Sequence, residues 1–270
     1  MRLVHNYLRS IALLSDTHIG SRLGVCPSGY VTEATKNPIM ANPGQESLAS
    51  SFGKFWDKMD EMKVDTVFLI GDIMSGINFR EMGMFMMTTD INEQVAMATL
   101  LLRKHCSNRK TYVWSGTPYH ESRDYRIHET LAKDLGGQFM GSLSNMMLKP
   151  SKKTVHVRHA TTSAMIYPET VLGRDIMFLK EAEALGQVPK IDAIITGHRH
   201  SFIEIHKASV HYLSLPCWEA FTPYYKATMN YFKYQPDIGG ALMLLDSDNR
   251  LRFMHFLYPC PKITDRLVSG

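Results

Sequence analysis

The stretch Leu13-Leu14-Ser15-Asp16-Thr17-His18 continues an apolar run that begins at Ile11 and is typical of a buried strand. Asp16 and His18 are two residues apart, so in an extended segment their side chains leave on the same face. A carboxylate oxygen and an imidazole nitrogen aimed at one point suit Mn, Fe or Zn better than Ca. By itself the motif fits a polar pair in the core equally well. The residues at the ends of the other strands are needed to distinguish a metal site from such a pair.

The composition is that of an ordinary globular protein. The 270 residues are 44% apolar and 21% charged, which suffices for one large domain or two small ones. No apolar run approaches the ~18 residues of a membrane span, and the N-terminus lacks the apolar core of a signal peptide. The four cysteines form no C-x-x-C pair, which favours reduced thiols. These features predict a cytoplasmic protein away from membranes, and the net charge of +4 mildly favours an anionic partner.

Apolar strands and amphipathic helices alternate along the chain, without internal repeats. The apolar pattern predicts helices over 48–62, 91–105, 122–135 and 168–186. It predicts further strands over 64–70, 111–114, 139–148, 154–159, 191–196, 202–206, 211–215, 241–245 and 251–257. The stretches 20–45 and 218–234 have the composition of long loops. A single domain over 1–270 is the simplest organisation.

Side chains that can bind a metal ion stand at the ends of several predicted strands. Asp16 and His18 follow the first strand, and Asp72 closes the next. Later strands end in Thr117 or His120, in His159, and in His198 and His200. Ligands gather at the carboxyl ends of parallel strands. With twelve histidines in the chain, chance explains any one of these placements but not the ordered set.

In this order the motifs resemble those of the calcineurin-like metallophosphoesterase superfamily, which are D-x-H, G-D, G-N-H-D/E, a lone His and G-H-x-H. Here they are Asp16-Thr17-His18, Gly71-Asp72, Gly116-Thr117-Pro118-Tyr119-His120, His159 and Gly197-His198-Arg199-His200. The resemblance spans about residues 10–215. It implies an α/β fold in which two mixed β-sheets pack as a sandwich flanked by helices, in four layers α/β/β/α. The site would lie on loops at one edge.

The resemblance also implies a site for two divalent metal ions, with Mn favoured over Fe, Zn or Ni. The implied ligands are Asp16, His18 and His200 for one ion, His159 and His198 for the other, and Asp72 as the bridge. Two ions ~3.5–4 Å apart clamp a phosphate and lower the pKa of a bridging water, which leaves hydroxide as the nucleophile. His120 would protonate the leaving oxygen or stabilise charge on it.

The third motif departs from the family pattern. Thr117 stands where the family has the Asn that binds the second ion, and its hydroxyl is a poorer ligand. His120 comes three residues after Thr117 instead of one. Pro118 restrains the turn, so His120 can still reach the site, or His120 can itself bind metal. The variant resembles a subset that occurs in phage and metagenomic phosphoesterases.

Other candidate residues have two interpretations each. Glu121 either orients His120 or is a surface residue, and Arg199 either touches a substrate phosphate or lies on the surface. The aromatic residues of 218–234 could stack unpaired bases, but core or a dimer surface is favoured, which leaves a homo-oligomer open. The seven remaining histidines are expected on the surface or satisfied in the core; they are His5, His105, His128, His156, His206, His211 and His255.

Three functions fit the pattern. The first is a metal-dependent phosphodiesterase or nuclease acting on nucleic acid or a nucleotide, which the basic charge and the aromatic loop favour. The second is a phosphomonoesterase acting on a phosphoprotein or a small phosphate. The third is a non-catalytic scaffold. The nearly complete ligand set argues against the third, because a scaffold has no need to keep it.

Overall fold

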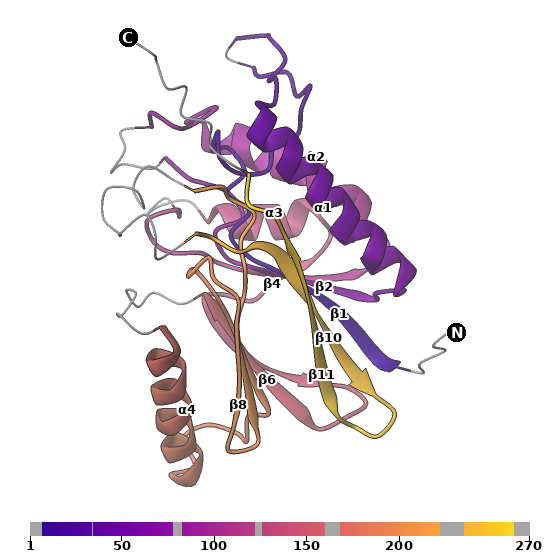
Figure 1. Ribbon diagram of the computed structural model, residues 1–270, viewed down its shortest axis with the longest axis vertical. Coiled ribbons are helices and arrows are strands. Elements are labelled where there is room, and N and C mark those ends of the chain that lie inside the picture. Colours follow the sequence, from indigo (N-terminus) through magenta and orange to yellow (C-terminus); the bar gives the residue numbers. More distant parts are fainter. Residues whose placement is uncertain are drawn as a thin grey trace.

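The computed structural model describes residues 7–33, 35–77, 83–121, 126–159, 168–221 and 235–261. These residues form two β-sheets and four helices (Figure 1). No helix among them is long and apolar enough to cross a bilayer.

The first sheet has the strand order β11-β10-β1-β2-β3-β4 in the described residues. Strands β1 to β4 run parallel, whereas β10 and β11 are antiparallel to their neighbours. The bounds are Tyr7–Leu14 for β1, Thr66–Ile70 for β2, Lys110–Trp114 for β3, Gln138–Phe139 for β4, Ile238–Asp246 for β10 and Leu251–Tyr258 for β11. The carboxyl ends of β1, β2 and β3 therefore meet at one edge.

The second sheet has the order β5-β6-β7-β9-β8 in the described residues. Its central strands β6, β7 and β9 are parallel, and β5 and β8 are antiparallel edges. The bounds are Leu143–Leu148 for β5, Lys153–His159 for β6, Ala193–Gly197 for β7, Ile203–Lys207 for β8 and Val210–Ser214 for β9.

Alternate residues of the buried strands face different layers. Ile11 and Leu13 of β1 pack between the sheets, together with Val155 of the second sheet. Their neighbours Ala12 and Leu14 pack on the other face against the helices. This alternation follows from the two-residue period of a strand.

Helices cover the outer faces of both sheets (Figure 1). The first sheet is covered by α1 (Pro43–Glu61), α2 (Ile91–Cys106) and α3 (Ile127–Asp134), and α4 (Pro168–Ala184) covers the second. The four-layer α/β/β/α sandwich expected from the resemblance is confirmed.

Two predicted boundaries are wrong for identifiable reasons. Helix α1 begins at Pro43, because Asn42 and Gln45 form a capping box ahead of the apolar pattern. The expected strand 139–148 is two strands, β4 in the first sheet and β5 in the second. Gly141 lies between them with φ 75°, where the chain passes from one sheet to the other. The predicted start of α3 at Ser122 lies outside the described residues.

Candidate metal centre

The first half of the site comes from the adjacent parallel strands β1 and β2. Asp16 and His18 follow β1, and Asp72 follows β2; all three are buried. The two loops are joined by backbone hydrogen bonds, in which Asp16 N donates to Gly71 O (3.1 Å) and His18 N donates to Asp72 O (3.1 Å). This pairing holds three candidate ligands in one rigid edge.

The second half comes from the other sheet. His159 is the last residue of β6, and His198 and His200 directly follow β7. These two strands are parallel neighbours, so their ends meet the ends of β1 and β2 across the sandwich.

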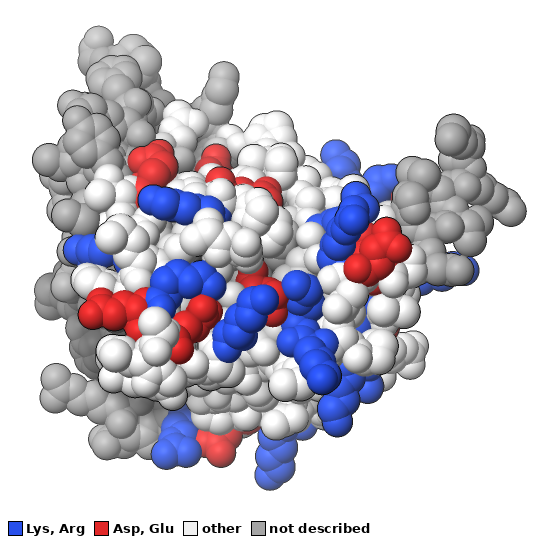
Figure 2. All heavy atoms as spheres, turned by 90° about the horizontal axis from the view of Figure 1, so that it is seen from below, with Lys and Arg blue, Asp and Glu red and all other residues white. Residues whose placement is uncertain are grey.

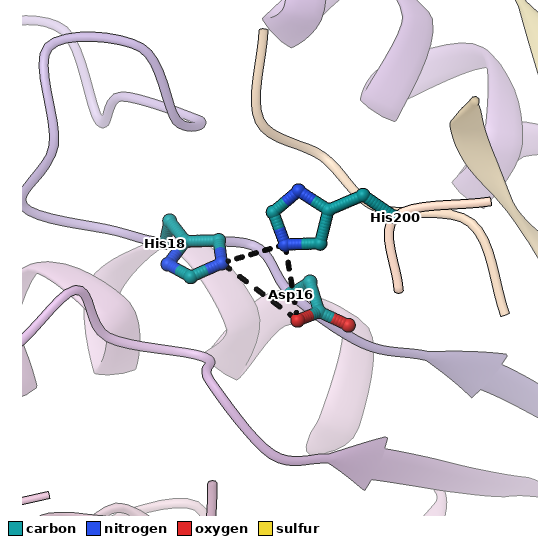
Figure 3. A group of neighbouring side chains, drawn as sticks. All are labelled: Asp16, His18 and His200. Atoms are coloured by element: carbon teal, nitrogen blue, oxygen red, sulfur yellow. Dashed lines mark hydrogen bonds and ion pairs between the residues drawn. The ribbon is translucent and has the colours of Figure 1, made fainter. Parts of the chain in front are cut away.

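Asp16, His18 and His200 form a compact group (Figure 3). Asp16 Oδ1 lies 3.7 Å from His18 Nε2 and 3.2 Å from His200 Nε2, and the two Nε2 atoms are 3.1 Å apart. Asp16 Oδ2 accepts hydrogen bonds from Ser15 Oγ and His198 N, whereas no described residue donates a hydrogen bond to the buried Oδ1. Three donor atoms thus converge on a point that a divalent cation would fit.

Asp72, His159 and His198 form a second group. Asp72 Oδ2 lies 2.9 Å from His159 Nε2 and 4.0 Å from His198 Nδ1. His159 Nδ1 donates to Ile70 O at 2.9 Å, which leaves Nε2 to face the site. His159 Nε2 is also 3.6 Å from Asp16 Oδ1, so the two groups adjoin.

Thr117 and His120 of the third motif also lie beside Asp72. Thr117 N donates to Asp72 Oδ1 at 2.8 Å, and the Thr117 hydroxyl lies 3.3 and 3.4 Å from the two oxygens of Asp72. His120 Nδ1 lies 2.6 Å from Ser75 O, a pure acceptor, so Nδ1 carries hydrogen and Nε2 faces Asp72 Oδ2 at 3.9 Å. The ring of His120 is 4.7 Å from that of His18. The structure therefore brings every predicted site residue together.

Charge interactions shift the pKa values of the group. Burial alone would raise the pKa of Asp16, but His159 and His200 lower it well below its ordinary value. Burial opposes the charge of His159 too, yet Asp72 and Asp16 raise its pKa to about 9. Burial, with His159 nearby, lowers the pKa of His198 to about 4.

Two motif glycines are required by close approach of the ligands. A Cβ at Gly116 would lie 1.9 Å from Asp72 Oδ1, and one at Gly197 would lie 1.9 Å from Ser15 Oγ. Both positions need glycine because any side chain there would overlap a neighbouring side chain of the site.

Five candidate ligands have a left-handed backbone, with φ of 53° at Asp16, 45° at His18, 48° at Asp72, 84° at His198 and 54° at His200. We call these the left-handed ligands. Such a conformation costs a non-glycine residue about 1–3 kcal/mol and clusters at functional sites. The folded loops therefore hold these side chains against a local preference.

Near the site, Glu121 has a different role from the one predicted, and Glu219 was not predicted at all. Glu121 does not orient His120; it accepts a hydrogen bond from His128 Nδ1, and His128 Nε2 accepts one from Ile73 N at 3.0 Å. His128 is thus a satisfied core residue that supports the loop of Asp72. Glu219 is buried 3.7 Å from His18 Nε2, and no motif marks it.

The aromatic stretch is described only in part. Trp218 and Phe221 are buried, and Trp218 packs against Phe52 and Phe55 with ring centroids 4.9 and 5.7 Å away. These two residues belong to the core, as the favoured interpretation held. Residues 222–234 lie outside the described residues.

Comparisons with known proteins find matches among solved structures. No protein-family model matches the chain, and no curated protein matches its sequence. An archaeal phosphodiesterase is 12% identical over 92% of this chain and 99% of its own, with a TM-score of 0.44. Vps29 from Cryptosporidium parvum is 12% identical over 94% and 99%, with a TM-score of 0.45. A zinc complex of Vps29 from Entamoeba histolytica is 10% identical over 93% and 99%, with a TM-score of 0.42. Because these scores are below 0.5, the fold assignment rests on the sheet order of this chain.

Proposed function

We propose that this chain is a calcineurin-like metallophosphoesterase that hydrolyses phosphodiesters of nucleic acids or nucleotides with the help of two divalent ions. One observation carries the proposal. Two adjoining groups of Asp and His side chains, drawn from both sheets and buried except for the half-buried His198, meet at Asp16 and Asp72.

The residues fit such ions. Asp16 Oδ1 is buried without a hydrogen bond from any described residue, and it faces imidazole nitrogens at 3.2 to 3.7 Å. Mixed nitrogen and oxygen donors suit Mn, Fe or Zn. One ion would be held by Asp16, His18 and His200, the other by His159 and His198, with Asp72 shared. When bound, the ions would polarise the phosphate and activate a water molecule.

The third motif has two tasks in this proposal. Thr117 orients Asp72 through its backbone N–H, which makes Thr117 more important for the position of that carboxylate than as an ion ligand. His120 is held by Ser75 O, and its Nε2 would release a proton to the leaving oxygen. Burial lowers the pKa of His120, which makes its Nε2–H a stronger acid but reduces the protonated fraction at pH 7.

The charge of the site supports a diester over a monoester. Asp16, Asp72 and Glu219 place three buried carboxylates around the site, and each reduces the positive charge that two ions would present. A phosphodiester carries one negative charge and a monoester close to two, so a less positive site suits the diester better. The face presented in Figure 2 carries Lys and Arg side chains together with Asp and Glu side chains, so this face does not by itself favour either substrate.

Metal analysis and two substrates test the proposal. The purified protein should bind two Mn²⁺ per chain, more tightly at the Asp16–His18–His200 group, because Thr117 replaces a better ligand on the other side. With Mn²⁺ it should hydrolyse bis-p-nitrophenyl phosphate faster than p-nitrophenyl phosphate. The opposite preference would indicate a phosphomonoesterase, and a folded protein that binds no Mn²⁺ at saturation would refute the proposal.

A further inference from the structure

Glu219 is placed beside the site by a rigid segment that follows β9. Trp218 N donates to Asp16 O at 2.9 Å, and Ala220 N donates to Leu23 O at 2.8 Å. Glu219 thus lies between two residues whose backbones are fixed to the loop that carries Asp16 and His18. Only 6% of its surface is exposed.

Among the residues that the structure describes, the carboxylate of Glu219 has no permanent cationic partner. Its Oε2 lies 3.7 Å from His18 Nε2, and among the described residues no Lys or Arg forms an ion pair with it. An ionised carboxylate that is buried without a cation is costly, so a protein that keeps one usually supplies a cation. The nearest candidate site for a cation is the group of Asp16, His18 and His200.

The geometry fits a further ligand. His18 Nε2 lies 3.7 Å from Asp16 Oδ1, 3.1 Å from His200 Nε2 and 3.7 Å from Glu219 Oε2. An ion with bonds of about 2.0–2.2 Å separates neighbouring ligand atoms by about 3–3.5 Å, and the 3.7 Å between Glu219 Oε2 and His18 Nε2 is close to that spacing. The Glu219 side chain would have to rotate toward Asp16 and His200 to join their group, because it does not lie within 4.8 Å of all three members. We propose that Glu219 is an additional carboxylate ligand of the ion held by Asp16, His18 and His200. This inference rests on the proposed function.

The test compares Glu219→Gln with a matched control, Glu61→Gln. The first substitution keeps the shape of the side chain and removes its charge. The second removes the same charge at the C-terminal end of α1, where Glu61 is exposed and pairs with Lys58. Isothermal titration of Mn²⁺ into metal-free full-length protein should show the tighter site weakened at least tenfold by Glu219→Gln, the weaker site unchanged, and Glu61→Gln equal to wild type.

Thermal unfolding of the metal-free proteins separates a ligand from a structural residue. If Glu219 acts as a ligand, Glu219→Gln should leave the Tm of the metal-free protein close to that of wild type, because no ion is present to be lost. A lower metal-free Tm with unchanged Mn²⁺ affinity would show that Glu219 only stabilises the fold, and would overturn the inference.

Other outcomes are equally decisive. If wild type binds two Mn²⁺ and Glu219→Gln binds them as tightly, this inference fails while the proposed function stands. If wild type binds none, the proposed function fails first. Should Glu219→Gln not fold, Glu219→Asp replaces it: the shorter side chain should also weaken the tighter site, and unchanged affinity would overturn the inference.

Discussion

At the scale of single residues, Asp72 is the point on which the site depends. It lies 2.9 Å from His159 and is oriented by Thr117 N, so it can serve both groups. Asp72→Asn should therefore reduce kcat by about a hundredfold or more, beyond the effect of His198→Ala, which removes a ligand of one ion. The fold should survive, because the change is nearly isosteric. Steady-state kinetics and circular dichroism check this; wild-type turnover would show that Asp72 is not the bridge.

His120 should matter most when the leaving group is poor. A general acid contributes about 10²–10⁴-fold where the leaving alkoxide needs a proton, and much less for a nitrophenolate. His120→Ala should therefore slow a dinucleotide severely and bis-p-nitrophenyl phosphate only mildly, with metal content near wild type. Loss of metal would make His120 a ligand. Wild-type rates on both substrates would place it outside the reaction.

The pKa of His159 predicts how metal binding depends on pH. Its folded, metal-free pKa of about 9 exceeds the ordinary 6.5, so below pH 9 a proton occupies the ring and competes with an ion. Asp16 and Asp72 do not titrate in this range, because the pKa values of both are lowered. Mn²⁺ affinity at the His159 site should increase between pH 6.5 and 9, by up to about tenfold per unit. Calorimetric titrations at several pH values measure it, and a flat profile would contradict it.

At the scale of secondary-structure elements, the close approach of β2 and β3 loops sets a steric limit. A Cβ at Gly116 would overlap Asp72 Oδ1, so Gly116→Ala should destabilise the protein by about 1–3 kcal/mol and impair Mn²⁺ binding. Gly53 in α1 is a matched control, because nothing lies within 4 Å of its Cβ position. Gly53→Ala should stabilise by about 0.5–1 kcal/mol. Denaturant unfolding measures the free energy of unfolding of both variants. Equal changes in Gly116→Ala and Gly53→Ala would contradict the steric limit at Gly116.

Sequence alone could predict most elements and the ordered ligands, because apolar periodicity and motif spacing are local signals. It could not predict the split of 139–148 into β4 and β5, since both halves are extended and only their pairing differs. The sequence also could not predict the position of Glu219 beside His18 or the hydrogen bond between Glu121 and His128. These contacts join residues with no shared motif, and only the folded chain brings them together.

At the scale of the whole molecule, the site joins the two sheets. An ion shared by Asp16, His18 and His200 would connect the loop after β1 with the loop after β7. An ion present at a hundred times its Kd stabilises the folded state by about 2.7 kcal/mol. Removal of Mn²⁺ with a chelator should therefore lower Tm, and the decrease should be smaller in Asp72→Asn. Differential scanning calorimetry measures both, and a Tm that ignores the chelator in wild type would contradict this linkage.

The left-handed ligands also limit which amino acids their positions accept at all. Gly, Asn and Asp enter that backbone region at least cost, whereas β-branched residues are strongly disfavoured. A library that samples every amino acid at these positions can be scored for the cellular level of each variant and for its hydrolytic activity. Gly and Asn variants should accumulate in the cell as folded protein but should be inactive. His159, at the end of an ordinary strand, would give no such preference for Gly. The pattern of tolerated substitutions would thus record backbone geometry independently of the chemistry.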